Sequence, residues 1–292
     1  MNRHSPTAAK QRGMAIISAL LIAAVVAVIA GAMLTRQTVF TRSLEAEQLR
    51  VQGQWLLQGG LERSRQLLWD ARQRDVLTRL DQPWARAQVG VFEGRLDDEQ
   101  GKFNLRNLVN RQQTDAEQLQ GFERLCRLIG VDPAVSRRIS QRVIASYDRR
   151  EMPARYPMLR SLEELSGIEG VDPRLLRRLQ TYVSVLPGNT WVNGNTASAE
   201  VLSAVVPQLS LPQAQALVAE RDSGRWFINR GDFVNRLRMP QVAVDSVQVG
   251  ITSEWFRLQG QARREQRRVT IEALLHRPED RQPQVIWSRV GV

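Results

Sequence analysis

Residues 14–34 read MAIISALLIAAVVAVIAGAML and contain no charged side chain. As an α-helix this segment is about 31 Å long, enough to cross the hydrocarbon core of a bilayer. It has no polar face, whereas a helix in a water-soluble core would have one. A short basic segment, residues 1–13, precedes it, and the positive-inside tendency keeps such a segment in the cytoplasm. We therefore expect residues 14–34 to span a membrane and the following body to lie on the far side.

Three interpretations of this segment differ in where the chain would be cut. A secretory signal peptide would be cleaved near Ala30–Gly31–Ala32, which fits the small-x-small pattern, although the apolar run is longer than usual for such a signal. A plain anchor would stay uncut. Gly13, at the junction of basic leader and apolar run, resembles the processing site of type IV prepilins. In that family a peptidase cuts after the glycine, and the new N-terminus, here Met14, is methylated.

The composition excludes several classes of protein. With 292 residues, 42% hydrophobic and 24% charged, the chain is long enough for about two domains and is neither disordered, collagen-like nor a disulfide scaffold. Its single cysteine, Cys126, has no partner for an intramolecular bridge, and we expect a buried apolar side chain in a helix over residues 122–129. The only histidines, His4 and His276, lack metal-ligand spacing to it. We therefore expect no enzyme and no zinc site.

The basic excess does not by itself indicate nucleic-acid binding. The formal charge is +11, but the arginines occur as scattered doublets such as Arg137–Arg138 rather than as one patch. We expect these doublets to lie on solvated faces of helices and loops.

The pattern after the apolar run continues as a helix to about residue 75. Gly59–Gly60 interrupts it, and the low helix propensity of glycine predicts a bend there. The apolar residues form a loose stripe that would pack on a sheet: Leu44, Val51, Trp55, Leu57, Leu61 and Leu68.

Strand patterns flank a long helical region. Residues 89–96 predict a strand, residues 97–101 an acidic turn and residues 102–105 a returning strand. Near the C-terminus, alternation predicts strands at 255–258, 269–273 and 285–290, with residues 261–268 as an exposed basic loop.

A repeated turn marks the helical region, residues 113–187. Gly130–Val–Asp–Pro133 recurs forty residues later as Gly170–Val–Asp–Pro173. In each copy the glycine ends one helix, the aspartate caps the next and the proline takes its first turn. Such pairs resemble helix-hairpin-helix modules, which elsewhere bind DNA phosphates through turn amides. Here Asp132 and Asp172 occupy the electropositive helix starts, so we expect a structural role.

A second motif, Asn193-Gly-Asn-Thr-Ala-Ser198, precedes two predicted helices at 200–205 and 214–221. This block resembles one shared by K-type pseudopilins and membrane-tethered DNA receptors of competence systems. Those receptors place a Gly-x-Gly turn between the helices, whereas residues 207–212 contain no glycine. Thr196 or Ser198 would cap the first helix.

The order of these motifs resembles the K-type minor pseudopilins of type II secretion (general secretion pathway protein K family), which are type IV pilin-like. Residues 98–108, DEQGKFNLRNL, look like their D-x-x-G-[KR]-F-N-[LI]-N-x-L signature, with Arg106 in place of the usual asparagine. Family members usually carry glutamate at the fifth mature position, here Ser18. That membrane-buried carboxylate is offset by the terminal amine of a neighbouring subunit, so serine there implies the filament tip.

The resemblance implies an α+β fold: a long pilin-like N-terminal helix packed on a small antiparallel sheet, with an inserted all-α, helix-hairpin-helix-like domain. The boundaries that follow are 1–13 for the prepilin leader, 14–34 for the transmembrane part of the helix, 35–112 for the periplasmic helix and first strands, 113–188 for the all-α insert and 189–292 for the remaining α/β part.

The resemblance also implies a function and partners. The chain would be a non-enzymatic inner-membrane protein with its body in the periplasm, which initiates and caps the pseudopilus that exports folded proteins across the outer membrane. Its partners would be the I-, J- and H-type minor pseudopilins, the major pseudopilin, the prepilin peptidase and the inner-membrane secretion platform, with no nucleic acid. The alternative is a membrane-tethered helix-hairpin-helix DNA receptor of a competence-like system.

Calcium is the one cofactor that the resemblance raises, because some family members bind it near the helical insert. Calcium takes six to eight oxygen ligands, and the corresponding stretch mixes carboxylates with arginines. We assign no site, although four acidic residues would contribute oxygens if the fold gathered them: Asp148, Glu163, Glu164 and Asp222.

Overall fold

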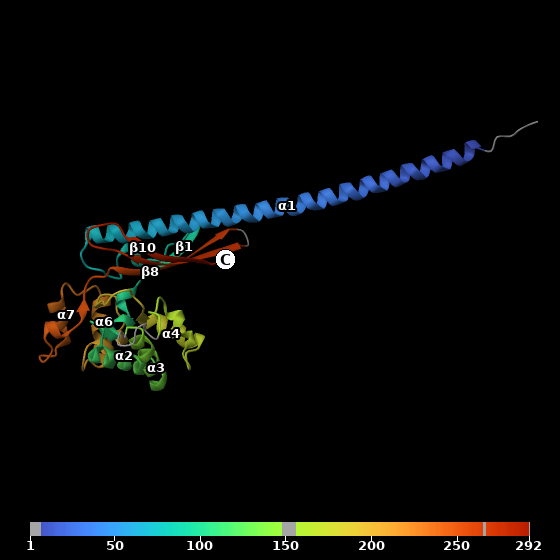
Figure 1. Cartoon of the computed structure of the whole chain (residues 1–292). Helices are drawn as coiled ribbons and strands as arrows, with labels where there is room; N and C mark the ends of the chain where they lie inside the picture. The colour runs from blue at the N-terminus through green and yellow to red at the C-terminus, as the bar shows by residue number, and fades with distance from the viewer. Residues whose placement is uncertain (1–6, 148–155, 265–266, 292) are drawn as a thin grey trace, which may run out of the picture. The chain divides into compact units, whose positions relative to one another are not determined.

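The computed structural model describes residues 7–147, 156–264 and 267–291 (Figure 1). The chain divides into two compact units, residues 1–55 and 56–292. A single helix, α1 (Thr7–Arg74), contributes to both. In the first unit, Ile16–Leu44 is long and apolar enough to cross a membrane, and its side chains are exposed.

The C-terminal part of α1 packs on an antiparallel sheet in the second unit. Leu57, Leu61 and Leu68 are buried against the strands, whereas Leu44 and Trp55 are exposed. The predicted stripe therefore packs on the sheet only from Leu57 onward, and its helical spacing places one face of the helix on the core.

The four-stranded sheet has the order β1-β8-β9-β10, and every neighbouring pair is antiparallel (Figure 1). The three C-terminal strands form a meander, and β1 adds to it across β8. Together with the helices this arrangement confirms the predicted α+β class. The strands are β1 (Phe92–Asp98), β8 (Trp255–Arg264), β9 (Arg267–His276) and β10 (Gln284–Gly291).

Two strand predictions were wrong. The basic segment 261–268 is not simply a loop, because β8 continues to Arg264 and β9 starts at Arg267, so the hairpin ladder extends through polar residues. The strand after the acidic turn does not return along β1. Instead β2 (Phe103–Asn104) pairs in parallel with β5 (Val183–Ser184), because the chain leaves the large sheet at a 3₁₀ helix, η2 (Glu99–Gly101).

Gly59–Gly60 does not interrupt α1, where the sequence predicted a bend. Gly60 instead allows close packing, since a Cβ placed on it would lie 2.4 Å from the ring of Phe92. Cβ atoms on Gly94 and Gly260 would come within 2.4 and 2.2 Å of the same ring. The three glycines, one each from α1, β1 and β8, therefore leave the space that the Phe92 ring fills. We call this arrangement the glycine cradle.

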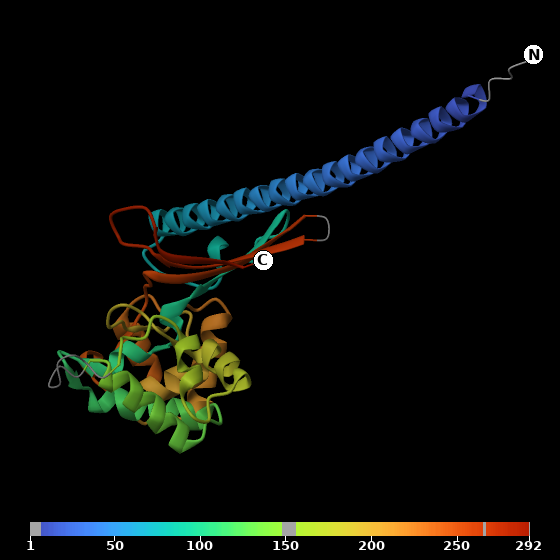
Figure 2. The same ribbon diagram turned by 45° about the vertical axis from the view of Figure 1, so that its right-hand side comes forward.

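Within the second unit, the helices between β2 and β7 have a hydrophobic core of their own, separate from that of the sheet (Figure 2). We call this part of the chain the helical body. That core includes Phe122 and Ile139 as well as Leu202 and Phe233, so the helices continue past residue 188, the predicted end of the insert. The helices are α2 (Ala116–Leu128), α3 (Pro133–Ala145), η4 (Leu162–Gly167), α4 (Pro173–Tyr182), α5 (Ala199–Val205), α6 (Leu211–Asp222) and α7 (Arg230–Leu237).

Short elements complete the chain. They are the 3₁₀ helices η1 (Pro83–Ala85), η3 (Leu105–Leu108) and η5 (Val244–Ser246), the antiparallel pair β3 (Val109–Asn110) and β4 (Gln113–Thr114), and the parallel pair β6 (Val192–Asn193) and β7 (Val249–Gly250).

Both predicted hairpin turns are confirmed. Gly130 and Gly170 have φ values of 70° and 88°, a left-handed conformation that favours glycine. The Asp132 carboxylate accepts hydrogen bonds from two backbone N–H groups at the start of α3, and Asp172 accepts one at the start of α4. In the second copy the first helix is the 3₁₀ helix η4 rather than an α-helix.

Cys126 lies in α2, is buried and is unpaired, as predicted. Burial in apolar surroundings raises the pKa of its thiol to about 11. It therefore serves as a core side chain.

Candidate functional site: a buried polar junction

The two sequence motifs, about ninety residues apart, meet at Asp98, the last residue of β1. Its Oδ2 accepts hydrogen bonds from Ser253 Oγ (2.6 Å), Thr196 Oγ1 (2.6 Å) and Asn193 Nδ2 (3.1 Å). Its Oδ1 accepts the backbone N–H of Gln100 at 2.8 Å. All four donors satisfy one buried carboxylate, which makes Asp98 the centre of the junction.

A buried arginine balances this carboxylate. Arg277, from the segment after β9, donates through Nη2 to the carbonyl of Ser253 and to Thr78 Oγ1, both at 2.7 Å. Burial lowers the pKa of Arg277 to about 10, and the charge of Asp98 opposes that shift. Burial raises the pKa of Asp98, although its hydrogen bonds act in the opposite direction. Ser253 therefore joins the two charged groups through its hydroxyl and its carbonyl.

The loop after α1 is part of the same junction. Asn193 Nδ2 donates to the carbonyl of Thr78 at 3.1 Å and to Ser253 Oγ at 2.8 Å, in addition to Asp98. The N–H of Ser253 donates to Thr78 Oγ1 at 3.0 Å. The junction thus ties the end of α1 and the strands of the sheet to β6 of the helical body.

The asparagine of the first motif holds a second contact between segments. Asn104 Nδ2 donates to the carbonyl of Gly188 at 2.8 Å, and its Oδ1 accepts the N–H of Leu186 at 3.2 Å. Asn107 Nδ2 donates to the carbonyl of Thr190 at 2.7 Å, and Asn107 Oδ1 accepts the N–H of Thr190 at 3.0 Å. The motif therefore positions the chain that enters β6.

The second motif is also held by hydrogen bonds to the end of α6 and to the segment that follows it. Asn195 exchanges two hydrogen bonds with the backbone of Phe227, at 2.9 and 2.8 Å. Arg221, buried at the end of α6, donates to the carbonyls of Gly194 (2.9 Å) and Ala197 (2.6 Å). These contacts leave the motif no freedom to rearrange without unpairing buried polar groups.

Of the two predicted caps for α5, Ser198 has that role. Its Oγ accepts the N–H of Val201 at 3.3 Å. Thr196 instead donates to Asp98 at 2.6 Å.

Arg106, which departs from the family pattern, has two local contacts. Its guanidinium lies 4.1 Å from the ring centre of Tyr147, and it donates to the carbonyl of Val109 at 2.6 Å. Arg106 therefore makes a cation–π contact with a residue that lies just after α3.

A cluster of charged side chains lies next to the junction, on η2, β8 and β9. The buried Glu99 accepts from Lys102 Nζ at 2.6 Å, and Arg257 Nε lies 3.4 Å from the same oxygen. Arg257 Nη1 donates to Glu272 at 3.1 Å. Two carboxylates and two cations therefore neutralise one another where η2 meets β8 and β9.

The three calcium candidates within the described residues, Glu163, Glu164 and Asp222, are not gathered into one group. Hydrogen bonds to the Glu163 carboxylate, among them one from Gln180 at 2.9 Å, outweigh the effect of burial and lower its pKa. Glu164 follows it in η4, whereas Asp222 in α6 accepts from Arg221 Nε at 2.8 Å. Asp148 lies outside the described residues. Among residues 7–147, 156–264 and 267–291, no group of three histidine, cysteine or acidic side chains is placed to hold a metal ion.

The turns that would bind DNA phosphates are occupied by the chain itself. Asp132 and Asp172 accept the N–H groups at the starts of α3 and α4. Before α6, the Gln213 side chain accepts the N–H of Ser210. A phosphate would have to displace carboxylates or this amide, so the geometry does not favour the DNA receptor.

The residues predicted for processing and assembly all lie in α1. Gly13, Met14 and Ser18 fall within its first turns, and Ser18 is exposed in the chain by itself.

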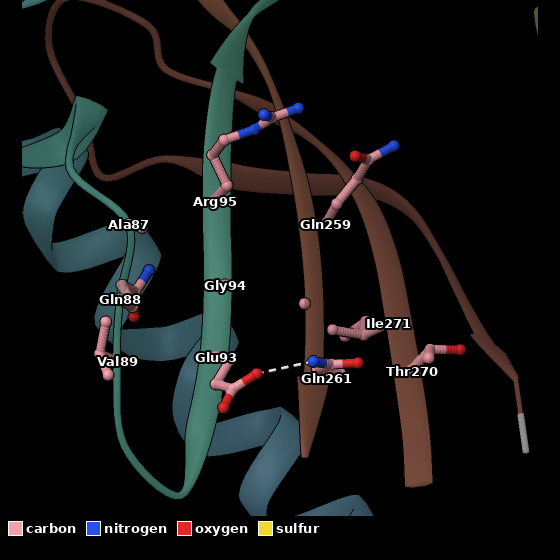
Figure 3. A pocket seen from close by; sticks show the side chains of 11 residues that line it. Ala87, Gln88, Val89, Glu93, Gly94, Arg95, Gln259, Gln261, Thr270 and Ile271 are labelled. Carbon is pink, nitrogen blue, oxygen red and sulfur yellow. Dashed lines mark hydrogen bonds between the residues drawn. The ribbon is translucent and has the colours of Figure 1, made fainter. Parts of the chain in front are cut away.

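A hollow of about 640 Å³ lies on the sheet face formed by β1 and β8 (Figure 3). It is lined by polar side chains such as Glu93 and Gln261, which are joined by a hydrogen bond of 2.6 Å. These groups satisfy one another, and the lining contains no nucleophile with an adjacent base.

Sequence reasoning missed Thr78, Ser253 and Arg277. They lie outside any motif, and only the approach of distant segments gives them partners.

Comparisons with known proteins give one consistent result. Two family models, both described as "Type II secretion system (T2SS), protein K", match residues 101–188 and 192–252, together about half of the chain. The protein K of Pseudomonas aeruginosa is 28% identical over 96% of this chain and 93% of its own length. That of Pectobacterium carotovorum is 29% identical over 74% of this chain and 77% of its own.

One solved structure shares the fold. It is the crystal structure of the GspK-GspI-GspJ complex from the type 2 secretion system of enterotoxigenic Escherichia coli. A chain of this complex superposes with a TM-score of 0.67 at 18% identity, over 85% of this chain and 99% of that chain. At this identity the likeness concerns the fold, in which a long helix, a sheet and a helical body recur.

Proposed function

The chain belongs to the protein K family of type II secretion, and from this premise we propose that it is the minor pseudopilin at the tip of the pseudopilus, where it initiates and caps filament assembly. The observation that carries the proposal is Ser18, in the membrane-spanning part of α1, at the position where other subunits of such filaments carry glutamate. Export of folded proteins across the outer membrane would depend on the filament that it starts.

The physical reason lies in the membrane. A carboxylate inside the bilayer costs roughly 2.5–3.5 kcal/mol on insertion scales, and a neighbour's terminal amine offsets that cost. A subunit with Ser18 has no carboxylate to pair with the amine of a subunit above it. It therefore adds to a filament through its apolar helix but offers no ionic partner for the next subunit.

The buried junction supports a capping role. Asn193 of the helical body donates to Asp98 Oδ2 at 3.1 Å, to Ser253 Oγ at 2.8 Å and to the carbonyl of Thr78 at 3.1 Å, and these buried bonds fix the helical body to the sheet. A bulky body that cannot swing aside would block the end of a filament. Such capping acts by steric blocking and requires no catalytic group.

Localisation and partners follow from the same proposal. Residues 1–13 would be the leader cut by the prepilin peptidase, residues 14–34 the membrane-spanning part and the body periplasmic. The I- and J-type pseudopilins correspond to the proteins in the complex of the structural neighbour. We add the H-type and major pseudopilins and the inner-membrane platform as partners.

The mass of the mature N-terminus tests this proposal. Processing as a pilin predicts a chain that begins at Met14 with one added methyl group. Gly13→Leu is expected to leave an unprocessed precursor and to abolish secretion. Gly31→Leu, in a glycine with open space around it, is the matched control and should leave processing unchanged. Cleavage near Ala32, or normal secretion by the Gly13 variant, would contradict the proposal.

The tip position has a separate test. Labelled chains in isolated pseudopili are expected at one end only. Copies repeated along the shaft, with subunits both above and below, would refute the capping role even if processing occurs after Gly13.

A further inference from the structure

Strand β10 is an open edge of the four-stranded sheet. Among the described residues it pairs with β9 and with no other strand. Val285, Ile286 and Val290 are 37%, 44% and 52% exposed, which makes this edge apolar. The backbone N–H and C=O groups on its outer side therefore face solvent beside exposed aliphatic side chains.

The opposite edge of the sheet is closed by the chain itself. Gln88 N donates to the carbonyl of Gly94 at 2.6 Å, and Gly94 N donates to the carbonyl of Gln88 at 3.0 Å. Figure 3 shows the segment of Gln88 and Val89 alongside β1. A further strand can thus be added at β10 but is blocked at the middle of β1.

The outer edge of β10 has little of the protection that edge strands normally carry. Charged residues, proline and bulges are the usual devices. Here Arg289 is the one charge in the strand, and one irregularity lies between Val285 and Trp287. Val285 and Val290 pair with Leu275 and Ile271, whose side chains pack on the α1 side of the sheet. The exposed valines therefore extend the apolar α1 face beyond the helix.

The edge is continuous with the side of α1. Arg65 Nε donates at 2.7 Å to the carbonyl of Pro283, the residue before β10, and Arg72 forms an ion pair of 2.6 Å with Glu279. Figure 1 shows β10 beside this part of the helix. A subunit that packs along this side of α1 would reach β10 without any rearrangement.

We propose that β10 receives an extended strand from a neighbouring minor pseudopilin, so that the sheet continues across the subunit interface. The inference rests on the proposed function, which supplies the partner class, while the open edge supplies the mode of binding. An extended backbone is the one structure that satisfies a row of alternating N–H and C=O groups. Apolar side chains of the added strand would cover Val285 and Val290.

Site-specific photocrosslinking in the full chain tests the contact. A photoreactive residue would replace Ile286 or Val290, with Val89 and Val91 as matched controls because they are 88% and 68% exposed at the closed edge. In cells that contain the complete secretion system, we expect adducts with an I- or J-type pseudopilin from the two β10 positions only. Adducts with a second copy of this chain, or equal adducts from the controls, would overturn the proposal.

Hydrogen exchange of the purified complex tests the mode of binding. Strand addition should slow every second backbone amide of β10 by at least about tenfold relative to the chain alone. Protection of consecutive amides, or of none, would rule out strand pairing.

Two further variants separate this inference from the proposed function. Ile286→Lys with Val290→Lys should weaken association at least tenfold, whereas Val89→Lys with Val91→Lys should not. If the β10 variant still assembles normally while the Met14 terminus is found, the inference fails and the pseudopilin assignment stands. If no pseudopilin associates even with the unmodified chain, the proposed function itself fails.

Discussion

Substituting alanine for Gly60 should destabilise the protein, although the same change at Gly59 should stabilise it. Both glycines lie in α1, and alanine has a helix propensity about 0.8–1.0 kcal/mol better than glycine. Nothing lies within 4 Å of a Cβ added to Gly59, which is exposed. A Cβ on Gly60 would lie 2.4 Å from the Phe92 ring, which the glycine cradle holds on two other sides.

The free-energy cost of Gly60→Ala depends on how the Phe92 ring can move away from the new methyl group. The ring already occupies the positions that Cβ atoms on Gly94 and Gly260 would take, so the backbones of β1 and β8 limit its movement away from Gly60. It must either strain the packing, at about 1–3 kcal/mol, or leave the core, which loses about 1.5–3 kcal/mol of burial. After the gain in helix propensity, Gly60→Ala should cost about 0.5–2 kcal/mol net. The difference from Gly59→Ala should be about 1–3 kcal/mol.

Urea unfolding of the full chain in detergent measures this difference. Tryptophan fluorescence is a suitable signal because Trp84 packs edge-on against Phe256 in the same core, with ring centres 5.1 Å apart. Each kcal/mol corresponds to roughly 2–4 °C in the midpoint of thermal unfolding for a body of this size. In the background of Phe92→Ala, which empties the cradle, Gly60→Ala should stabilise the protein as Gly59→Ala does.

Equal effects of the two single substitutions would refute this reasoning. So would a Gly60→Ala penalty that persists when Phe92 is alanine, because the clash would then not be with the ring.

Two further predictions concern buried titratable groups. Burial raises the pKa of Asp98 in the folded state above its unfolded-state value of about 3.8, so the folded protein holds this proton more tightly. The stabilisation that this proton gives to the folded state is fully present below about pH 3.8 and is lost as the pH rises through the folded-state pKa. Asp98→Asn, with an amide facing donors, should cost about 1–3 kcal/mol and abolish that pH dependence, as urea unfolding from pH 3 to 8 would show. Burial likewise raises the pKa of Cys126 to about 11, so stability should fall as the pH rises from 9 toward 11. Its alkylation at pH 8 should require unfolding, and rapid labelling of the native chain would contradict the burial.

The helical hairpins and the membrane-spanning helix could be predicted because their causes are local. Gly130, Asp132 and Pro133 each act on neighbouring backbone groups, and the outcome was the left-handed glycine and the capped helix that the sequence indicated. The choice of Ser198 over Thr196 as the cap of α5 was open, because both side chains could reach a helix N–H. Asp98 took Thr196 as a donor and thereby decided it.

The strand predictions failed where the partner was distant in sequence. The alternation in residues 102–105 indicated a strand but not that Phe103 would pair with Val183. Polar side chains at 261–264 suggested a loop, yet the backbone ladder of β8 and β9 continued through them. Hydrogen bonding of a strand depends on its neighbour, and its own side chains describe only its two faces.

In the candidate site, too, some residues could be predicted from local motifs and others could not. Asp98 and Asn193 were visible as motif positions, whereas Thr78, Ser253 and Arg277 were not, because none belongs to a local pattern. The role of Gly60 was also misread, since a glycine in a helix looks like a weak point until the ring that fills its place is seen.

The sequence by itself determined that this chain contains an apolar helix of membrane-spanning length and two capped helical turns, since periodicity, charge and capping act over a few residues. Only the tertiary structure decided that the junction around a buried carboxylate joins five separate segments, that three glycines leave space for one aromatic ring and that one edge of the sheet stays open. Each of these depends on segments far apart in the chain, which become neighbours only when the chain folds.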